Sequence, residues 1–328
     1  MTRWIASALA DLREADRDAA DAVAERAAQV LRPPGALARL DVVAEWVAAW
    51  QGTAHPRVER PHCLVFGGDH GIAAAGVSAY PADVTVAMQA AIQQGKATIT
   101  ALGAALAVPV TLVDVGIARP TADIRHVDAL DHDRCDAIVE RAVAAVDDLD
   151  TDLLVIGELG IGNTTVAAAV CACLYDESAD RWVGRGTGID NDGLQRKLDA
   201  VEQTRQRVVP AEPLEVLRRA GGSELLAMAA ATLAARRRGI PVVVDGFVAT
   251  AALAPLHTAA PGALDHCLVG HVSAEPGHRR LLERLGKEPL LALDMRLGEA
   301  SGAMLAVPLV RAACAAVTDV ATFGEWFG

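Results

Sequence analysis

The sequence lacks an uninterrupted apolar stretch long enough to cross a membrane, although 52% of its 328 residues are hydrophobic. Charged residues interrupt every apolar run before about 18 residues, which is close to the length that a spanning helix needs. The start, MTRWIASALADLREADRDAADA, has Asp and Glu where a secretory signal would need a continuous apolar core. We therefore expect no membrane association and no export, and we expect this segment to begin the first amphipathic helix.

Disulfide frameworks and nucleic-acid surfaces are also missing. The cysteines form no CxxC pair and lie at positions 63, 135, 171, 173, 267 and 314. Such spacing is typical of reduced thiols, so a cytoplasmic location is expected. The formal net charge is −12, and no stripe of Lys and Arg with interleaved aromatic residues occurs, so nucleic acid is not an expected partner. The densest basic cluster, residues 236–238, ends an Ala-rich segment, where cations favour a helix dipole.

Several catalytic and nucleotide-binding motifs are absent as well. The sequence contains no Walker A motif, no GxGxxG fingerprint and no GxSxG nucleophile turn. Asp69 and His70 are adjacent, but together with His271 and His278 they show no recognised metal-ligand spacing. We therefore expect neither a metal nor an organic cofactor, and we expect Asp69 to order its loop by bonding backbone amides.

What the sequence does contain is a series of short apolar runs, each ending in a Gly- or Asp-containing turn and followed by a helical pattern. Near-continuous runs of Val, Leu and Ile between helices predict an α/β fold with a mostly parallel sheet covered on both faces. Ligands of such sheets bind beyond the carboxyl ends of the strands, so the turns there are the expected site. The predicted strands are 63–71, 110–116, 153–160, 241–247, 267–271 and 290–295.

The chain start and one internal segment differ from this pattern. Residues 1 to about 50 have apolar residues at three-to-four spacing, broken by a Pro-Pro-Gly turn and stopped by Gly52, which predicts an N-terminal helical layer. Residues 117–150 are acidic and poorly patterned, so we expect a variable surface excursion there.

Two of the predicted turns have the residues for chemistry. The first, 157–165, has closely spaced glycines and could cradle a phosphate, with Asn163 or Thr164 capping the next helix; an ordinary tight turn explains the pattern equally well. The second, 296–302, contains Glu299, whose pKa could rise in a partly desolvated site toward the range of a general base. The alternative is a Glu that complements a helix dipole.

Six blocks of the sequence, in order, resemble those of the nicotinate-nucleotide:dimethylbenzimidazole phosphoribosyltransferases. They are GGDHGIAAAGVSAYPADVT, IGELGIGNTT, VGRGTGIDNDGLQRK, PVVVDGFVATAA, GHVSAEPGH and LDMRLGEASGAMLAVPLVRAA. The resemblance covers the chain from about residue 30 to its end, and PPGALARLDVVAEW near the start is similar to a further family segment. It implies a Rossmann-like sheet with a smaller helical part from the chain ends, in a homodimer. We assign residues 1–58 and 301–328 to helical segments and residues 59–300 to the α/β catalytic domain.

The resemblance also implies a reaction. The family transfers phosphoribose from nicotinate mononucleotide to 5,6-dimethylbenzimidazole, releasing nicotinate and inverting the anomeric carbon. It implies Glu299 as the general base, with Glu158 as a second catalytic carboxylate and Lys197 near the phosphate. The remaining substrate-binding residues that it implies are Ser78, Tyr80, Gly160, Gly162, Asn163, Thr164 and Ser273.

One departure from the family pattern bears on the acceptor. GEGTG is GEASG in this sequence, so Ala300 follows the expected base. Its methyl group could point into the base site and favour a less substituted benzimidazole, or the residue could adopt an ordinary φ and leave the pocket unchanged. Two further readings stay open: the same transfer to another acceptor, such as adenine, another benzimidazole or a phenol, and a non-catalytic nucleotide-binding or regulatory protein.

Overall fold

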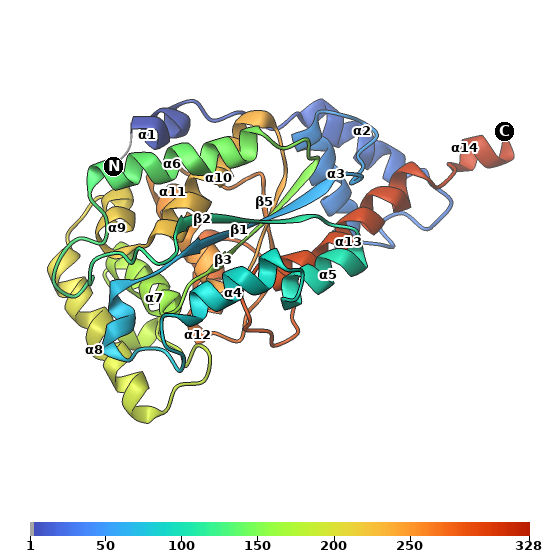
Figure 1. Ribbon diagram of the computed structural model, residues 1–328. Coiled ribbons are helices and arrows are strands. Elements are labelled where there is room, and N and C mark those ends of the chain that lie inside the picture. Colours follow the sequence, from blue (N-terminus) through green and yellow to red (C-terminus); the bar gives the residue numbers. More distant parts are fainter. Residues whose placement is uncertain (1–2) are drawn as a thin grey trace.

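The computed structural model describes residues 3–328 and contains one six-stranded parallel sheet with helices on both faces (Figure 1). The strand order is β2-β1-β3-β4-β5-β6, and every neighbouring pair is parallel. All six predicted strands are present, which confirms the α/β fold class, although β4 and β6 are shorter than expected. The strands are β1 (Pro61–Gly68), β2 (Val110–Gly116), β3 (Leu153–Leu159), β4 (Val242–Val244), β5 (Cys267–His271) and β6 (Pro289–Leu291).

Alternate residues of the strands point into two separate apolar layers. Leu64 and Ile156 belong to one buried cluster, whereas their neighbours Val65 and Val155 belong to the other, as the two-residue period of a strand requires. The first layer is formed with α1 (Arg3–Ala10), α6 (His132–Asp147), α7 (Asn163–Tyr175), α8 (Asn191–Val208), α9 (Pro213–Ala220), α10 (Ser223–Arg238), α11 (Phe247–Ala259) and α12 (Pro276–Leu285).

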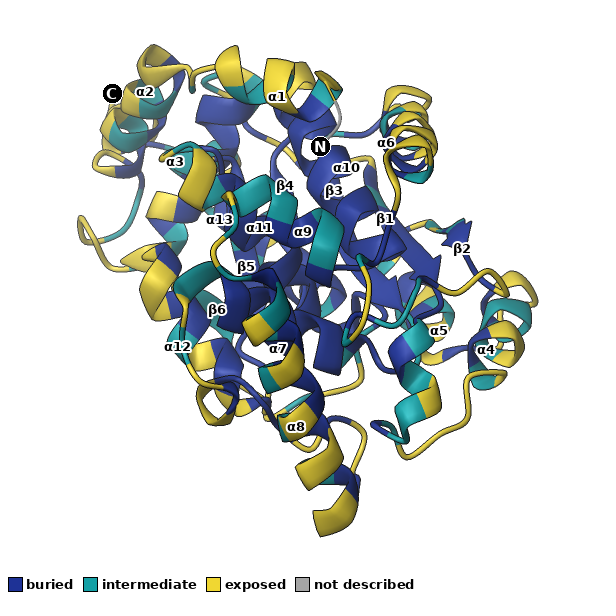
Figure 2. Ribbon diagram, turned by 90° about the vertical axis from the view of Figure 1, so that its left-hand side faces the viewer, coloured by how far each residue is buried: buried dark blue, intermediate teal, exposed yellow. Residues whose placement is uncertain are grey.

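The opposite layer is formed with α2 (Arg17–Ala27), α3 (Arg39–Gln51), α4 (Val84–Gln93), α5 (Thr98–Leu106) and α13 (Ser301–Thr318). Figure 2 shows the sheet and the inner helix faces as a continuous buried interior. The remaining helices are short: η1 (Gly71–Ala75), η2 (Ala179–Arg181) and α14 (Phe323–Phe327).

The segment after α2 lies beside the C-terminal end of the chain, whereas the N-terminus lies on the other side of the molecule (Figure 1). Val30 forms an isolated antiparallel bridge with Thr322, and Arg26 pairs with Glu325 at 3.1 Å. Helix α3 ends where the sequence predicts, because Gly52 takes a left-handed φ of 67° and caps it. Helix α13 contacts both α3 and the sheet, while the division of the chain at residues 58 and 300 stays a prediction.

The expected surface excursion at 117–150 is wrong for half of its length, because residues 132–147 form the regular helix α6. Asp131 caps it by accepting a hydrogen bond from the Arg134 N–H at 2.7 Å. Cys135, Ile138 and Ala142 are buried at helical spacing, although acidic residues between them obscure the pattern in the sequence.

Among the described residues, only helix α13 is long and apolar enough to span a membrane, by length and composition alone. Its inner face is buried against the sheet, and 56% of the segment Ser301–Thr318 is buried in the fold. A core helix passes the same test, and α13 occupies a core position.

Candidate active site

The adjacent strands β1 and β3 mark the point where the strand order reverses. Strand β2 lies outside β1, whereas β4, β5 and β6 follow beyond β3. Ligands of open parallel sheets bind beyond the carboxyl ends of the strands at such a point. β1 ends at Gly68 and β3 at Leu159, in adjacent positions of the sheet. The candidate site therefore begins with the residues that close these two strands.

Glu158 lies buried at this edge, one residue before the end of β3. It is 8% exposed, and Asn163 Nδ2 at the start of α7 donates a hydrogen bond to its Oε2. Burial, with further contributions from Asp245 and Glu224, holds the pKa of the Glu158 carboxyl well above its usual range, although the Asn163 bond acts in the opposite direction. Glu158 is thus an oriented carboxyl group whose surroundings favour its neutral form.

Glu299 lies directly beside Glu158, in the turn before α13. Its N–H donates to the Glu158 backbone oxygen at 3.1 Å, and a Cβ added at Gly298 would lie 2.5 Å from Glu158 Oε1. Glu299 is 5% exposed, and its buried Oε2 has no hydrogen-bond partner among residues 3–328. Burial, followed by the charge of Asp245, raises the pKa of Glu299. An unpartnered buried carboxyl oxygen with a raised pKa is suited to accepting a proton.

The backbone around Glu299 is left-handed over three successive residues. The φ angles of Gly298, Glu299 and Ala300 are 80°, 57° and 62°, so the idea that Ala300 adopts an ordinary φ is wrong. Ala300 is fully buried in the apolar layer with α13, and a Cβ added at Gly157 would lie 2.7 Å from its methyl group. The missing side chain of Gly157 in β3 leaves the space that Ala300 fills.

Asp245 follows β4 and fixes the start of α13. Its Oδ1 accepts hydrogen bonds from the N–H groups of Gly302 and Ala303 at 2.8 and 3.0 Å, and His271 Nε2 lies 3.4 Å from the same oxygen. Two N–H groups that would lack helical partners are thereby satisfied. Asp245 is not among the predicted site residues, although an acidic residue directly after a buried parallel strand is a signal that the sequence contains.

Lys197 on α8 is a buried cation beside the first turn of α7. It is 1% exposed, and its Nζ donates to Thr164 Oγ1 at 2.9 Å and to the Gly184 carbonyl at 3.0 Å. Burial lowers the pKa of Lys197 to about 8, although the charge of Glu275 opposes this shift. The adjacent cavity, of about 480 Å³, is lined by Val183, Gly184, Arg185, Gly186, Gly188, Leu194, Ala274, Glu275, Pro276 and Arg296. Ammonium, hydroxyl and guanidinium groups gathered around a cavity can bind a phosphate.

The glycines of the 157–165 turn have separate structural roles. A Cβ added at Gly160 would lie 2.4 Å from the Gly68 carbonyl oxygen, so only glycine fits between β1 and β3. Gly162 has a φ of 92° and is the N-cap of α7, without a side-chain cap. The expected capping by Asn163 or Thr164 is wrong, because the helix already begins at Asn163 and their side chains bond Glu158 and Lys197 instead.

The other expected binding residues lie on two further loops. Ser78 and Tyr80 follow η1, where Ser78 Oγ accepts a hydrogen bond from the Tyr80 N–H at 3.3 Å and Tyr80 is 52% exposed. Ser273 follows β5 and is 7% exposed; its N–H donates to His278 Nδ1 at 2.9 Å. No hydrogen bond between described residues links either loop directly to Glu158 or Glu299.

Known proteins match this chain over nearly its full length. A family model described as a phosphoribosyltransferase matches residues 12–326. The chain belongs to this phosphoribosyltransferase family. It is 50% identical over 314 residues to the nicotinate-nucleotide–dimethylbenzimidazole phosphoribosyltransferase of Methylorubrum extorquens, covering 95% of this chain and 92% of that protein. It is 48% identical over 321 residues to the enzyme of that name from Novosphingobium aromaticivorans, covering 97% and 95%.

Solved structures agree with these sequence relatives. The CobT protein of Thermus thermophilus superposes with a TM-score of 0.90 at 38% identity, covering 94% of this chain and 98% of that one. A second structure, of a nicotinate-nucleotide-dimethylbenzimidazole phosphoribosyltransferase from the same organism, has a TM-score of 0.89 at 37% identity and the same coverage. The fold and the enzyme class expected from the sequence are thereby confirmed.

In this phosphoribosyltransferase a buried His–Glu pair supports the turn below Glu158. His70 Nε2 lies 2.6 Å from Glu224 Oε1, and both side chains are fully buried. The pair borders Gly160, where an added Cβ would lie 3.3 Å from the same His70 nitrogen. The neighbouring Asp69 accepts a hydrogen bond from the Ala118 N–H at 2.7 Å, which confirms its expected role in ordering the loop. Residues 3–328 contain no group of three or more His, Cys, Asp or Glu side chains placed to hold a metal ion.

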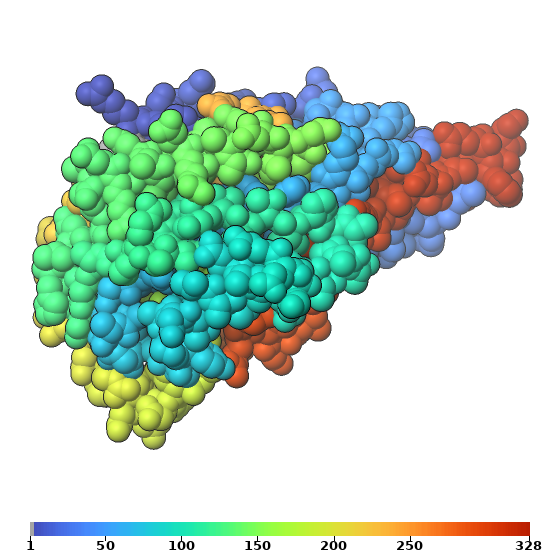
Figure 3. Space-filling model, viewed as in Figure 1, coloured from blue at the N-terminus to red at the C-terminus, as the bar shows by residue number. Residues whose placement is uncertain are grey.

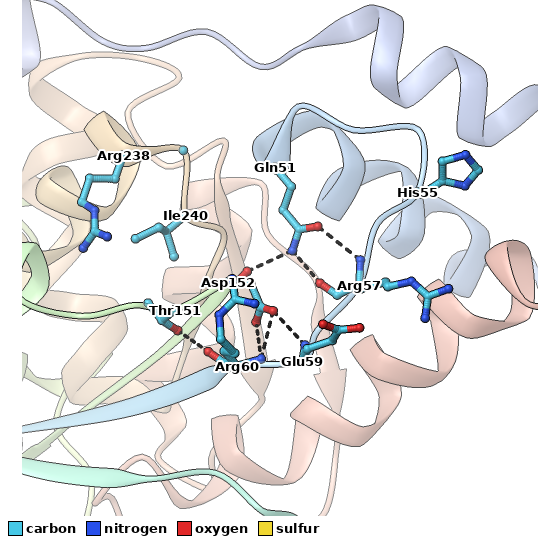
Figure 4. Close-up of a pocket in the computed structure, with 10 residues that line it drawn as sticks. Gln51, His55, Arg57, Glu59, Arg60, Thr151, Asp152, Arg238 and Ile240 are labelled. Atoms are coloured by element: carbon cyan, nitrogen blue, oxygen red, sulfur yellow. Dashed lines mark hydrogen bonds between the residues drawn. The ribbon is translucent and has the colours of Figure 1, made fainter.

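A hollow at the opposite, amino-terminal edge of the sheet differs from this site (Figure 4). Its volume is about 360 Å³. Gln51 Nε2 donates to the carbonyls of Arg57 and Asp152 at 2.7 and 3.1 Å, and the Asp152 carboxylate accepts from the N–H groups of Glu59 and Arg60. Hydrogen bonds among these polar groups connect α3 to the starts of β1 and β3. Among the described residues that line the hollow, none has an unpartnered buried carboxyl oxygen like that of Glu299.

Proposed function

We propose that this phosphoribosyltransferase moves the 5-phosphoribosyl group of nicotinate mononucleotide to 5,6-dimethylbenzimidazole, with Glu299 as the general base. The observation that supports this assignment is the Glu158–Glu299 pair: two buried carboxyls joined through a backbone hydrogen bond at the switch point of the sheet. The relatives that match almost the whole chain are named for this reaction.

The proposed step balances without an added reactant. One benzimidazole nitrogen forms a bond to C1 of the ribose as the bond from C1 to the pyridinium nitrogen breaks, with inversion at C1. The electron pair of the breaking bond neutralises the pyridinium and gives nicotinate. The second benzimidazole nitrogen loses its proton to the ionised Glu299. The raised pKa of Glu299 makes its carboxylate a stronger base than an ordinary glutamate.

Glu158 supports the same step from the other side of the turn. The positive charge that develops on the ribose in an oxocarbenium-like transition state favours the ionised form of Glu158, which burial disfavours in the free protein. The Asn163 hydrogen bond holds that carboxylate in place and stabilises its ionised form. The missing side chain of Gly298 leaves room for Glu158 Oε1 beside the turn that contains Glu299.

The nucleotide phosphate is assigned to the corner around Lys197. Lys197 Nζ is held by Thr164 and the Gly184 carbonyl, and the adjoining cavity has Arg185 and Arg296 in its lining. Positive side chains that are already ordered lose little conformational freedom when the anion binds. We assign Ser78, Tyr80 and Ser273 to the substrate-binding loops, as the resemblance implies.

5,6-Dimethylbenzimidazole is the default acceptor, because Ala300, the residue that departs from the family pattern, is buried in the core and does not line the acceptor site. The Ala300 methyl group is buried against Gly157 in β3. The Ala300 methyl group therefore gives no reason to favour a less substituted acceptor over 5,6-dimethylbenzimidazole.

The decisive measurement is nicotinate release from nicotinate mononucleotide with and without 5,6-dimethylbenzimidazole, with the ribosylated product identified by mass. We expect release to require the acceptor and to equal product formation. Release at the same rate without any acceptor, or no release in its presence, contradicts the proposal and favours a hydrolase or a non-catalytic nucleotide-binding protein.

We further propose a homodimer that works in the cytoplasm. The resemblance implies the dimer, and apolar surface is available for it: Phe323, Trp326 and Phe327 on α14 are 48%, 67% and 76% exposed. Sedimentation equilibrium should give twice the 34.1 kDa chain mass, and Trp326→Ser with Phe327→Ser should shift it toward the monomer if α14 contributes. A wild-type mass of one chain at micromolar concentration contradicts the dimer.

A further inference from the structure

We propose that a groove between α6 and the edge strand β2 is a second anion site, which binds a small phosphate monoester with an apolar or aromatic group. This α6 groove is separate from the corner around Lys197. Its volume is about 310 Å³, and it is lined by Val115, Arg119, Arg134, Ala137, Ile138 and Arg141.

The sequence of α6 places four of these residues on one helix face. Arg134, Ala137, Ile138 and Arg141 are spaced at i, i+3, i+4 and i+7, so they form a continuous stripe. Val115 near the end of β2 lies opposite that stripe. In Figure 1 helix α6 crosses beside β2 at the edge of the sheet, and the green segments that form this edge are on the surface in Figure 3.

The three guanidinium groups of the α6 groove are not equivalent. Arg134 is anchored, because it donates to the Pro120 carbonyl at 2.9 Å and to Ser223 Oγ at 3.0 Å. Arg119 and Arg141 are exposed, and neither side chain has a hydrogen bond or ion pair with another described residue. One fixed cation and two free ones therefore line the same groove.

Among residues 3–328, no carboxylate lines the α6 groove, although the whole chain has a formal charge of −12. The two acids whose charge acts on Arg134, Asp131 and Glu224, do not line the groove, and neither carboxylate bonds the Arg134 guanidinium. Asp131 caps α6 by accepting from the Arg134 N–H, and Glu224 pairs with His70. The groove thus has three guanidinium groups and no carboxylate among its lining residues.

This composition selects the class of ligand. A guanidinium fork matches two oxygens of a phosphate, and several together favour a dianion. Val115, Ala137 and Ile138 provide an apolar wall that inorganic phosphate would not use. The volume lies near the lower end of the roughly 300–1,000 Å³ range of small-molecule pockets, which favours a monoester of modest size over a macromolecule.

The hollow in Figure 4 provides the matched comparison, since it also contains arginines. There Arg57 pairs with Asp319 at 3.2 Å and Arg60 pairs with Asp150 at 3.3 Å. Those arginines have partners within the chain, and Asp152 and Glu59 line the same hollow. We expect no comparable anion affinity at that place.

Phenyl phosphate is a suitable probe because it combines a phosphate dianion with one aromatic ring. Titration calorimetry should detect its binding to the wild-type protein, with weaker binding of inorganic phosphate and none of phenol. Arg119→Ala with Arg141→Ala should weaken phenyl phosphate about tenfold or more, since two charge-assisted contacts are lost. Arg57→Ala with Arg60→Ala removes the same formal charge and should change binding less than about twofold.

The location is settled by a third variant, Lys197→Ala. Loss of phenyl phosphate binding in Lys197→Ala, but not in the Arg119/Arg141 pair, would assign the probe to the substrate corner and overturn the proposal. Equal losses in both arginine pairs, or no binding to wild type, would also overturn it. The Arg119/Arg141 variant should keep wild-type transfer activity and thermal midpoint, because both side chains are exposed and lie outside the substrate site.

Discussion

The two ends of the candidate site bury charge in opposite ways. Around Glu158 and Glu299, burial and the nearby Asp245 raise the carboxyl pKa values; around Lys197, burial lowers the ammonium pKa to about 8. In both places the charged form is disfavoured in the free protein. At the acid end, the charge of Asp245 raises the pKa values of both glutamates, whereas at the basic end the Lys197 ammonium is held by a hydroxyl and a carbonyl. The acid end is therefore suited to moving a proton, and the basic end to receiving an anion with the substrate.

Removal of the proposed base should have the largest effect. Glu299→Gln keeps the side-chain shape but cannot accept the proton, so kcat should fall by roughly 10²–10⁴-fold, the usual contribution of acid–base catalysis. Steady-state kinetics with both substrates saturating measures the change. Glu25→Gln, on the exposed face of α2, is the matched control and should be neutral. Near wild-type turnover in Glu299→Gln would remove it as the base.

Loss of the buried ammonium should affect substrate binding more than turnover. Lys197→Ala should raise KM for nicotinate mononucleotide by about 10–100-fold, because hydrogen bonds to charged groups contribute about 1.5–3 kcal/mol. KM for 5,6-dimethylbenzimidazole, which has no phosphate, should change less than about twofold. Lys96→Ala, an exposed lysine, controls for net charge. Equal increases in both KM values would contradict a phosphate role.

The two ends should also separate along the pH axis. Lys197 has a pKa lowered to about 8, so it loses its proton as the pH rises through that value and KM for nicotinate mononucleotide should increase several-fold between pH 7 and 9. Glu299 has a raised pKa and must be ionised to act as the base, so kcat should fall as the pH is lowered. This fall should occur at a higher pH than the usual pKa of a glutamate. In Lys197→Ala the alkaline rise in KM should disappear while the acidic fall in kcat remains.

The sequence predicts the strands and the post-strand turns well because their signals are local. Each strand is a short apolar run; the 157–165 turn closes β3, and the turn with Glu299 comes after the run that contains β6. Strand β6 ends at Leu291 instead of 295, since its pairing with β5 stops there. The local sequence of β6 does not show where β5 ends.

The missed residues depend on contacts between distant parts of the chain. His70 and Glu224 are separated by 154 positions, and Asp245 acts on α13 through N–H groups more than 50 residues away. The buried state of Ala300 depends on the absence of a side chain at Gly157 in another element. Single-residue patterns show which residues can do chemistry, but the packing of the sheet decides which of them meet.

Asp245 should connect the acid end to the helix that follows it. Asp245→Asn keeps an oxygen for the Gly302 and Ala303 N–H groups but removes a charge that raises the Glu299 pKa, so the acidic limb of the kcat profile should move to lower pH. Asp245→Ala also loses the helix cap and should reduce the free energy of unfolding by about 0.5–2 kcal/mol. Chemical denaturation and pH-rate profiles measure the two effects. An unchanged profile in Asp245→Asn would show that its charge does not reach Glu299.

The smallest effect is expected at Ala300, where two terms oppose each other. Ala300→Gly relieves the cost of a left-handed alanine, at most about 1–2 kcal/mol, but it also removes a fully buried methyl group, which stabilises by about 0.8 kcal/mol. The free energy of unfolding should therefore change little. Because the methyl group contacts Gly157 in β3, the ratio of kcat/KM for 5,6-dimethylbenzimidazole and unsubstituted benzimidazole should stay within about twofold. Pockets discriminate by about 1–3 kcal/mol for a methylene-sized difference, so a methyl group that did reach the acceptor would shift this ratio tenfold or more. A competition assay of both acceptors on wild type and Ala300→Gly separates these outcomes, and a tenfold shift would place Ala300 in the acceptor pocket instead of the core.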